Sequence, residues 1–236
     1  MNQPEAAATV LVTGAGRRLG RAIAIDLARA GWRVGVHYHR SEQEAAAVVA
    51  EIEDQGGKGT ALQADLGRTE QFAPLIRACS ERLGPVSCLI NNAAHYDWDN
   101  LESMSLESWT SHLDIDLRAP VFLTQAFAAL LPETATGNVI NLIDQKVWRL
   151  NPDYFSYTIA KSALWTATQT MAQALAPRIR VNAIAPGPVL RSQDQSQAEF
   201  EQESRATLLQ QHVGAEDVTA AVRFLLDTPS VTGQMI

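Results

Sequence analysis

Tyr157 and Lys161 stand four residues apart in the segment YTIAK, and their types and spacing suit proton chemistry. On a helix, residues at this spacing lie on one face. A lysine ammonium beside a phenol favours the phenolate electrostatically, which shifts the tyrosine toward exchanging a proton with a substrate. The pattern is common by itself, so its meaning depends on the elements around it.

A second candidate is the glycine-containing segment VTGAGRRLG, residues 12–20. It lies between an expected strand at 9–12 and an expected helix at 18–30, where backbone N–H groups and a helix N-terminus can together receive a pyrophosphate. Arg18 occupies a place where such a loop is expected to have glycine. Turns of this kind also serve simple chain reversal, so both interpretations stay open.

The end of the second expected strand distinguishes between the two dinucleotides. An acidic residue there would accept hydrogen bonds from the ribose 2′-hydroxyl of NAD, but the sequence reads Tyr38-His39-Arg40-Ser41. Arg40, Ser41 and the nearby Arg17 offer charge-assisted donors suited to a 2′-phosphate. This favours NADP(H) as the cofactor, and an exposed polar strand end is the plainer alternative.

The elements that must position these residues alternate along the chain. Expected strands are 9–12, 33–39, 60–64, 86–91, 138–143 and 179–185, and expected helices are 18–30, 41–55, 69–83, 106–131, 155–176, 196–211 and 215–227. This rhythm predicts a parallel sheet with crossover helices, and the near-continuous Val, Ile and Leu of the strands indicate burial on both faces. The candidate residues follow strands, at the edge where such sheets bind ligands.

Composition narrows the class of function. The chain has 236 residues, 46% of them hydrophobic, and a net charge of −7, which favours one domain over residues 1–236 and gives no general footprint for nucleic acid or an anionic membrane. Its N-terminal apolar run is too short for a signal sequence or a membrane span, so we expect a cytoplasmic protein. We expect Cys79 and Cys88 to be buried thiols and no catalytic metal, because the histidines lack ligand spacing.

Taken in order, the segments TGAGRRLG, Asp65-Leu66, NNAA, YTIAK and PG resemble the short-chain dehydrogenase/reductase family over almost the whole chain. The resemblance implies a Rossmann-like α/β fold, with a doubly wound parallel sheet in three layers, and an active site that usually contains Asn, Ser, Tyr and Lys. Two positions depart from that pattern. Asp144, thirteen residues before Tyr157, stands where serine is usual, and Asp116 stands where asparagine is usual.

The pteridine reductase branch is similar in these departures: it has arginine in the glycine loop, the strand end HYHRS, an aspartate thirteen residues before the tyrosine, and an aromatic residue after the NNA turn, here Tyr96. Bacterial dihydromonapterin reductases also resemble the Asp144–Lys161 stretch. The resemblance implies that Arg18 contacts cofactor phosphate and pterin, that Tyr96 stacks on the pterin, and that Asp144 and Tyr157 deliver the proton.

The candidate sites form three sets. The catalytic set is Tyr157, Lys161 and Asp144, and the substrate set is Arg18, Tyr96, Asp144 and Tyr157. The cofactor set is Gly14, Arg17, Arg18, Leu19, Gly20, Tyr38, His39, Arg40, Ser41, Asp65, Leu66, Asn92, Ala93, Ala94, Asp116, Leu142, Tyr157, Lys161, Pro186 and Gly187. Trp98 and Trp148 are candidate apolar walls for a flat ring, or simply packing residues.

A carboxylate near Tyr157 raises the pKa of its phenol, which opposes the base role in alcohol oxidation and favours proton donation. We therefore expect an NADPH-dependent reductase of a pterin-like C=N bond, acting on a small molecule. The alternatives are a ketone or 3-oxoacyl reductase using the same Tyr157 and Lys161, and an NADP(H)-binding sensor without turnover.

Two segments carry further expectations. The polar stretch 192–203 is either a mobile substrate lid or a solvated surface helix. After VTGQMI, family members usually continue through a last strand and tail, which this sequence is expected to lack. The family resemblance also implies a homodimer or homotetramer, with the faces of 106–131 and 155–176 as candidate contacts.

Overall fold

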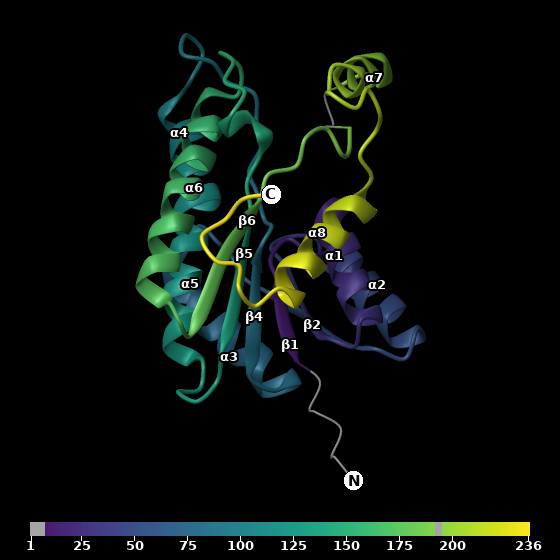
Figure 1. The fold of residues 1–236 in the computed structure, drawn as a ribbon, viewed down its shortest axis with the longest axis vertical. Helices are drawn as coiled ribbons and strands as arrows, with labels where there is room; N and C mark the ends of the chain where they lie inside the picture. Colours follow the sequence, from purple (N-terminus) through teal and green to yellow (C-terminus); the bar gives the residue numbers. More distant parts are fainter. Residues whose placement is uncertain (1–7, 192–194) are drawn as a thin grey trace.

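Six parallel strands form one sheet in the order β3-β2-β1-β4-β5-β6 (Figure 1). The structure, a computed structural model, describes residues 8–191 and 195–236. The strands are β1 (Thr9–Val12), β2 (Arg33–Tyr38), β3 (Lys58–Gln63), β4 (Val86–Asn91), β5 (Gly137–Leu142) and β6 (Ile179–Ile184). The doubly wound α/β fold expected from the sequence is confirmed, and every strand lies within two residues of its expected bounds.

Helices cover both faces of the sheet (Figure 1). One layer contains α1 (Arg18–Arg29), α2 (Glu42–Asp54) and α8 (Ala215–Asp227), and the other contains α3 (Phe72–Leu83), α4 (Leu106–Leu113), α5 (Ala119–Leu130) and α6 (Phe155–Leu175). Along β1, Val10 and Val12 pack toward the first layer and Leu11 toward the second, all fully buried. Burial on both faces explains the continuous apolar strands.

The sheet's strand order reverses between β1 and β4, and this fixes where the candidate site lies. Because all six strands are parallel, their carboxyl ends meet at one edge. The loops after β1 and β4 therefore lie side by side there, and those after β5 and β6 follow. In open α/β sheets this crevice is the ligand-binding edge.

The expected helix 106–131 forms as a continuous helical run with one irregular turn. Residues Asp114–Arg118 form a π-helical turn between α4 and α5. Pro120 in the first turn of α5 has no N–H to donate to the carbonyl of Asp116, so the ordinary α-helical ladder is interrupted at this point. The irregular turn contains Asp116, one of the residues singled out by sequence.

The expected helix 196–211 is too long. Only α7 (Gln197–Arg205) forms, opened by a capping box between Ser196 and Glu199, and the following Leu208 and Leu209 are exposed. Without a packing partner those residues have no apolar face to stabilise further turns. Residues 192–194 of the expected lid 192–203 lie outside the described residues; α7 itself is largely exposed and stands apart from the sheet at the upper right of Figure 1.

The last residues run parallel to β6 and widen the sheet at that edge. Ala183 donates its N–H to Gln234 at 2.8 Å and accepts the N–H of Ile236 at 3.1 Å. Cys79 and Cys88 are buried free thiols, as expected, and burial raises the pKa of each to about 12. Among the described residues no helix is long and apolar enough to cross a membrane.

Candidate active site

The glycine-containing loop is held against the turn after β4. Thr13 Oγ1 accepts the backbone N–H groups of Asn92 and Ala93 at 2.9 and 3.0 Å, and Asn92 Nδ2 donates to the Thr13 carbonyl at 2.8 Å. Gly14 has a φ of +63°, and a Cβ on Gly20 would lie 2.3 Å from the Gly14 carbonyl oxygen. Glycine is required at both positions, because other residues would be strained at the first and would clash at the second.

A buried histidine also fixes this loop. His37 Nδ1 accepts the Gly14 N–H at 3.0 Å, and its Nε2 lies 3.2 Å from the Ala64 carbonyl oxygen. Burial lowers the pKa of His37 to about 4, so the ring is neutral at physiological pH and the Nε2–H is free to donate to Ala64. The His37 ring therefore joins the loop after β1 to the end of β3.

The two arginines of the loop point to different partners. Arg17, at the N-cap of α1, forms an ion pair with Glu44 at the start of α2. Arg18 has a left-handed backbone with φ +50°, and its guanidinium donates to the carbonyls of Leu190 and Arg191 at 3.0 and 2.9 Å. Arg18 thus bridges the loop after β1 and the segment after β6.

The residues expected around the cofactor's ribose line the ends of β2 and β3. Arg40 and His39 are exposed, and His39 Nε2 lies 3.9 Å from Asp65 Oδ2. Asp65 Oδ1 accepts the Gly67 N–H at 2.8 Å, and Leu66 is buried. Tyr38, Ser41 and Leu19 are partly buried, and Ala94 follows Ala93 in the turn after β4.

Asp144 and Tyr157 meet in a direct hydrogen bond. The Tyr157 hydroxyl donates to Asp144 Oδ2 at 3.2 Å, and the second carboxylate oxygen accepts the Lys146 N–H at 2.8 Å. Asp144 lies two residues after the end of β5 and caps a short 3₁₀ turn, while Tyr157 lies in the first turn of α6. Two residues thirteen apart in sequence therefore form one proton-bearing pair.

Lys161 is held by different groups from those that hold Tyr157. Its Nζ donates to the Leu142 carbonyl at 2.9 Å and forms an ion pair with Asp116 Oδ1 at 3.2 Å, and it lies 5.5 Å from the centre of the Tyr157 ring. Asp116 is fully buried and its Oδ2 accepts the His95 N–H at 3.3 Å. The carboxylate that replaces the usual asparagine thus neutralises the lysine.

The pKa shifts follow from this arrangement. Burial, and next the negative charges of Asp144 and Asp116, raises the pKa of the Tyr157 phenol well above its ordinary value. Burial also raises the pKa of Asp144. The lysine alone was expected to favour the phenolate, but its charge is compensated by Asp116, so the buried carboxylates prevail and the phenol stays protonated.

Aromatic rings gather beside this pair. The Tyr96 ring stacks on Tyr154 with centroids 4.3 Å apart and meets the Tyr157 ring edge to face at 4.8 Å. Trp98 Nε1 donates to Asp153 at 3.3 Å and is not among the residues that line the cleft described next, whereas Trp148 is. Of the two tryptophans considered as walls, only Trp148 is among the lining residues.

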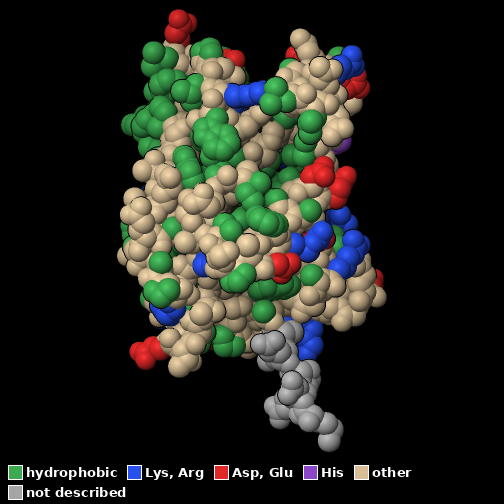
Figure 2. Space-filling model, viewed as in Figure 1, with side chains coloured by type: hydrophobic (Ala, Val, Ile, Leu, Met, Phe, Trp, Pro, Cys, Tyr) green, Lys and Arg blue, Asp and Glu red, His purple; other side chains and the backbone are tan. Residues whose placement is uncertain are grey.

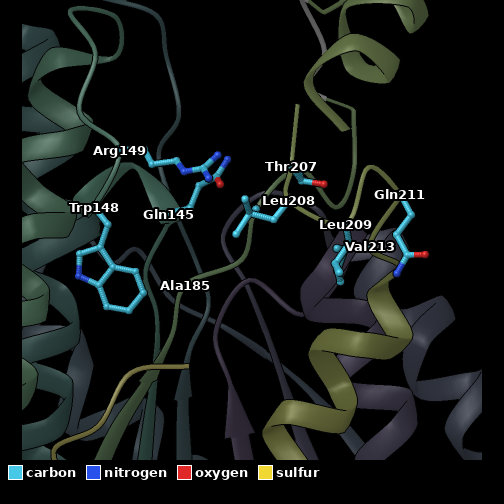
Figure 3. A pocket seen from close by; sticks show the side chains of 10 residues that line it. Gln145, Trp148, Arg149, Ala185, Thr207, Leu208, Leu209, Gln211 and Val213 are labelled. Carbon is cyan, nitrogen blue, oxygen red and sulfur yellow. The ribbon is translucent and has the colours of Figure 1, made fainter. Parts of the chain in front are cut away.

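A cleft of about 300 Å³ is lined by Gln145, the residue that follows Asp144. Figure 2 shows the surface notched between the α4–α6 side and α7, with hydrophobic side chains on the wall over α4 and α6. In Figure 3, Gln145 and Arg149 point from the loop after β5 toward Leu208 on the opposite wall. Ala185 and Gly187 also line the cleft, and the carbonyl of Pro186 between them accepts the Gln145 N–H at 3.1 Å.

Sequence patterns did not single out several residues of this region. Gln145, Arg149 and Leu208 line the cleft, and His37 fixes the glycine loop. Gln145 directly follows the predicted site residue Asp144, and this adjacency could have indicated that Gln145 also lies at the site. The partners of His37 are 23 and 27 residues away, and nothing in the sequence pairs them.

The fold and these contacts define the class of the protein. Residues 8–203 match the family model of the short chain dehydrogenases, and this chain belongs to that family. The resemblance inferred from the motifs is confirmed.

The proteins similar to this chain include an alternative dihydrofolate reductase, a ketoreductase and a 3-oxoacyl reductase. The structure of FolM alternative dihydrofolate reductase 1 from Brucella canis, complexed with NADP, is 44% identical and superimposes with a TM-score of 0.94 over 98% of this chain and 92% of that one. The angucycline C-6 ketoreductase LanV with bound NADP is 30% identical, with a TM-score of 0.89 over 97% and 93%. A 3-oxoacyl-[acyl-carrier-protein] reductase of Synechocystis sp. is 33% identical over 97% of this chain and 94% of that protein.

The buried Asp116 gives a testable pH dependence of stability. Burial raises its pKa to about 6 from 3.8, against the opposing effect of Lys161, so the folded chain binds this proton more tightly than the unfolded chain. The stability it contributes is present below about pH 4 and is lost as pH rises through about 6. Between pH 4 and 7 the free energy of unfolding of the wild-type protein should therefore fall by roughly 2 to 3 kcal/mol more than that of Asp116→Asn, as measured by urea denaturation.

Asp114→Asn is the matched control, because Asp114 lies on the same π-helical turn but forms a surface ion pair with Arg118 at 2.7 Å. An Asp116→Asn profile parallel to wild type across this range would contradict the assignment.

Proposed function

We propose that this protein is an NADPH-dependent reductase that transfers a hydride to a pterin-like C=N bond and supplies the proton from Tyr157 and Asp144. The observation that carries the proposal is the 3.2 Å hydrogen bond from the Tyr157 hydroxyl to a carboxyl group whose own pKa is raised by burial. Raised pKa values make both groups proton donors rather than proton acceptors, and the reduction of a C=N bond consumes a proton.

The chain's geometry fits NADP(H) at the carboxyl edge of the sheet. The first turn of α1 has N–H groups without any side-chain cap, and it is flanked by the close approach of Gly14 to the Asn92–Ala93 turn. A pyrophosphate would be held by these amides. When bound, NADPH supplies the hydride.

The preference for a 2′-phosphate rests on charge. The exposed Arg40 and the neighbouring Ser41 follow β2, and the segment Tyr38–Ser41 contains no carboxylate that would repel a phosphate. Arg17 lies over the start of α2 through its ion pair with Glu44. These donors would hold the 2′-phosphate, and the NADP complexes of similar structures support this assignment.

Proton delivery follows from the pair itself. With Asp144 protonated, its O–H donates to the Tyr157 oxygen, and the phenol proton is free to pass to the substrate nitrogen. The Asp144 proton then replaces it, and the carboxylate is reprotonated from water. Lys161, held by the Leu142 carbonyl and Asp116, lies beside the Tyr157 ring and would anchor the nicotinamide ribose.

The substrate is proposed from the surroundings of this pair. Tyr96 presents an aromatic ring next to Tyr157, and a flat heteroaromatic ring would pack on it. Arg18, already reaching across to the segment after β6, would contact both phosphate and substrate. The 44% identity to a chain called an alternative dihydrofolate reductase supports the same class.

A second candidate is reduction of a ketone or 3-oxoacyl group. The 3-oxoacyl-[acyl-carrier-protein] reductase and the ketoreductase LanV favour it, since Tyr157 and Lys161 would serve a carbonyl equally. Asp144 is the residue that separates the two functions.

Self-association as a homodimer or homotetramer and a cytoplasmic location complete the proposal. Exposed apolar side chains on the expected contact face, Leu106 of α4 and Phe122 of α5, support self-association.

Cofactor choice is tested by Arg40→Asp. Replacing a phosphate donor by a carboxylate at the end of β2 should invert the preference from NADPH to NADH, with at least a tenfold loss of NADPH affinity, since a lost charge-assisted contact is worth about 1.5 kcal/mol or more. Cofactor fluorescence titration of both nucleotides measures it. Equal binding of NADH and NADPH by the wild type would refute the assignment.

Asp144→Ser separates pterin from ketone reduction. Because the substitution removes the acid but leaves a hydroxyl that can bind a carbonyl oxygen, pterin turnover should fall by about two orders of magnitude while ketone turnover is kept or improved. The assay follows NADPH absorbance with dihydrobiopterin, dihydromonapterin and a ketone panel. Tyr157→Phe is the control that should lose both activities and still bind NADPH; parallel, small changes in Asp144→Ser would favour the carbonyl reductase.

A further inference from the structure

Three polar side chains form a buried network behind the catalytic tyrosine. Asp99, His112 and Ser156 come from the loop after β4, from α4 and from the start of α6, and none is more than 2% exposed. None of them takes part in the proton transfer described above. Buried polar groups are costly unless all are satisfied, so a complete network in this place calls for an explanation.

The hydrogen bonds run in one direction through the network. The Asp97 N–H donates to His112 Nε2 at 3.2 Å, which makes that nitrogen an acceptor and places the ring proton on Nδ1. The Nδ1–H then donates to Ser156 Oγ at 2.6 Å, and the Ser156 hydroxyl donates to the Asp99 carboxylate. Burial lowers the pKa of His112, in agreement with a neutral ring of one tautomer.

Asp99 accepts the remaining hydrogen bonds of the network. Its Oδ1 accepts the Ser156 N–H at 3.1 Å, its Oδ2 accepts the Ser108 hydroxyl at 2.9 Å, and its carbonyl accepts the Phe155 N–H at 3.3 Å. These hydrogen bonds lower the pKa of the carboxyl group against the effect of burial. The carboxylate thereby fixes the first turn of α6, where two N–H groups otherwise lack partners.

The network's members are sequence neighbours of the two rings in the site. Ser156 directly precedes Tyr157, and Asp97, bound to His112, directly follows Tyr96. The His112 ring also lies 4.7 Å from His95 and 6.0 Å from Tyr157, between centroids. One set of hydrogen bonds therefore ties the loop bearing Tyr96 to the helix bearing Tyr157.

We propose that Asp99, His112 and Ser156 are positioning residues that set the Tyr96 ring against the Tyr157 ring, and through this contact determine substrate binding and turnover without affecting the cofactor. The interplanar angle of 84° and the centroid distance of 4.8 Å are the geometry that the network holds. The inference rests on the proposed reductase function, because it needs a substrate beside Tyr157, but it applies to a pterin or a carbonyl substrate.

Two arguments separate this role from general stabilisation. The network joins residues adjacent to Tyr96 and Tyr157 in the elements after β4 and β5, whereas the glycine loop follows β1 and Arg40 follows β2, across the point where the strand order reverses. In addition, His112 accepts a hydrogen bond at Nε2 and donates one at Nδ1. A ring of similar size without nitrogen would fill the same space but would lose both hydrogen bonds. A displacement on the order of 1 Å in such a contact is enough to lower turnover about 100-fold.

The test compares three replacements of His112. His112→Phe removes both hydrogen bonds, His112→Asn keeps a donor near the Nδ1 position, and His112→Gln keeps an acceptor near the Nε2 position. We expect kcat/KM to fall about 30- to 100-fold in the Phe variant, with partial recovery in at least one amide variant, because each amide keeps a group that can form one of the two hydrogen bonds. The NADPH Kd should stay within about twofold.

Thr168→Val is the matched control, because Thr168 is another buried hydroxyl of α6, hydrogen-bonded to Asn141 at 2.8 Å and outside the site. It should lower the melting temperature with kcat/KM near wild type. If His112→Phe does not fold, Ser156→Ala carries the same comparison.

The assays use whichever substrate, dihydropterin or ketone, the wild type reduces. If the wild-type protein does not reduce dihydropterins, the pterin assignment is wrong, but the His112 variants can still be compared with a ketone as the substrate. Loss of NADPH affinity in step with kcat/KM, or a kcat/KM for His112→Phe no lower than for Thr168→Val at equal folded fraction, would overturn the positioning role.

Discussion

A phenol and a carboxyl group share a hydrogen bond at the carboxyl edge of the sheet, and the charges nearby are arranged around it. Tyr157 is almost fully buried, so ionising it would leave an anion next to Asp144 with little solvation. The pKa values of both groups are raised for this reason. Lys161 would otherwise pull the phenol toward its anion, and Asp116 compensates that charge at 3.2 Å.

The backbone supports this arrangement at specific points. The carboxylate of Asp116 lies on a π-helical turn that coincides with the missing N–H of Pro120, and the Leu142 carbonyl at the end of β5 fixes Lys161. Asp144 caps the turn that immediately follows β5. The parallel sheet therefore delivers the groups to one edge, and local irregularities orient them.

Much of this could be predicted because it depends on local pattern. Strands such as β1 and β4 are buried on both faces, which forces runs of Val, Ile and Leu, and their parallel order brings the loops after them together. Tyr157 and Lys161 needed only the helical repeat. The glycine loop needed only its place between a strand and a helix.

The remaining contacts depend on how distant segments come into register. Arg18 reaches carbonyls 172 and 173 residues away, and Asp99 meets Ser156 across 57 residues. No periodicity encodes such pairs. Asp116 pairs with Lys161 because the π-helical turn packs against α6, and this contact exists only in the folded structure. The same limit explains helix 196–211, whose last third lacks the tertiary partner that a helical pattern presumes.

The ionisation of Tyr157 is the most direct measurement of the central claim. Tyrosine rings labelled with carbon-13 can be followed by NMR as a function of pH, with Tyr157→Phe assigning the resonance among the four tyrosines. We expect the Tyr157 phenol to stay protonated up to at least about pH 10, the ordinary value for tyrosine, and to ionise more readily when Asp144 is replaced by Asn. A Tyr157 resonance that titrates near neutral pH in the wild-type protein would contradict proton donation by this pair.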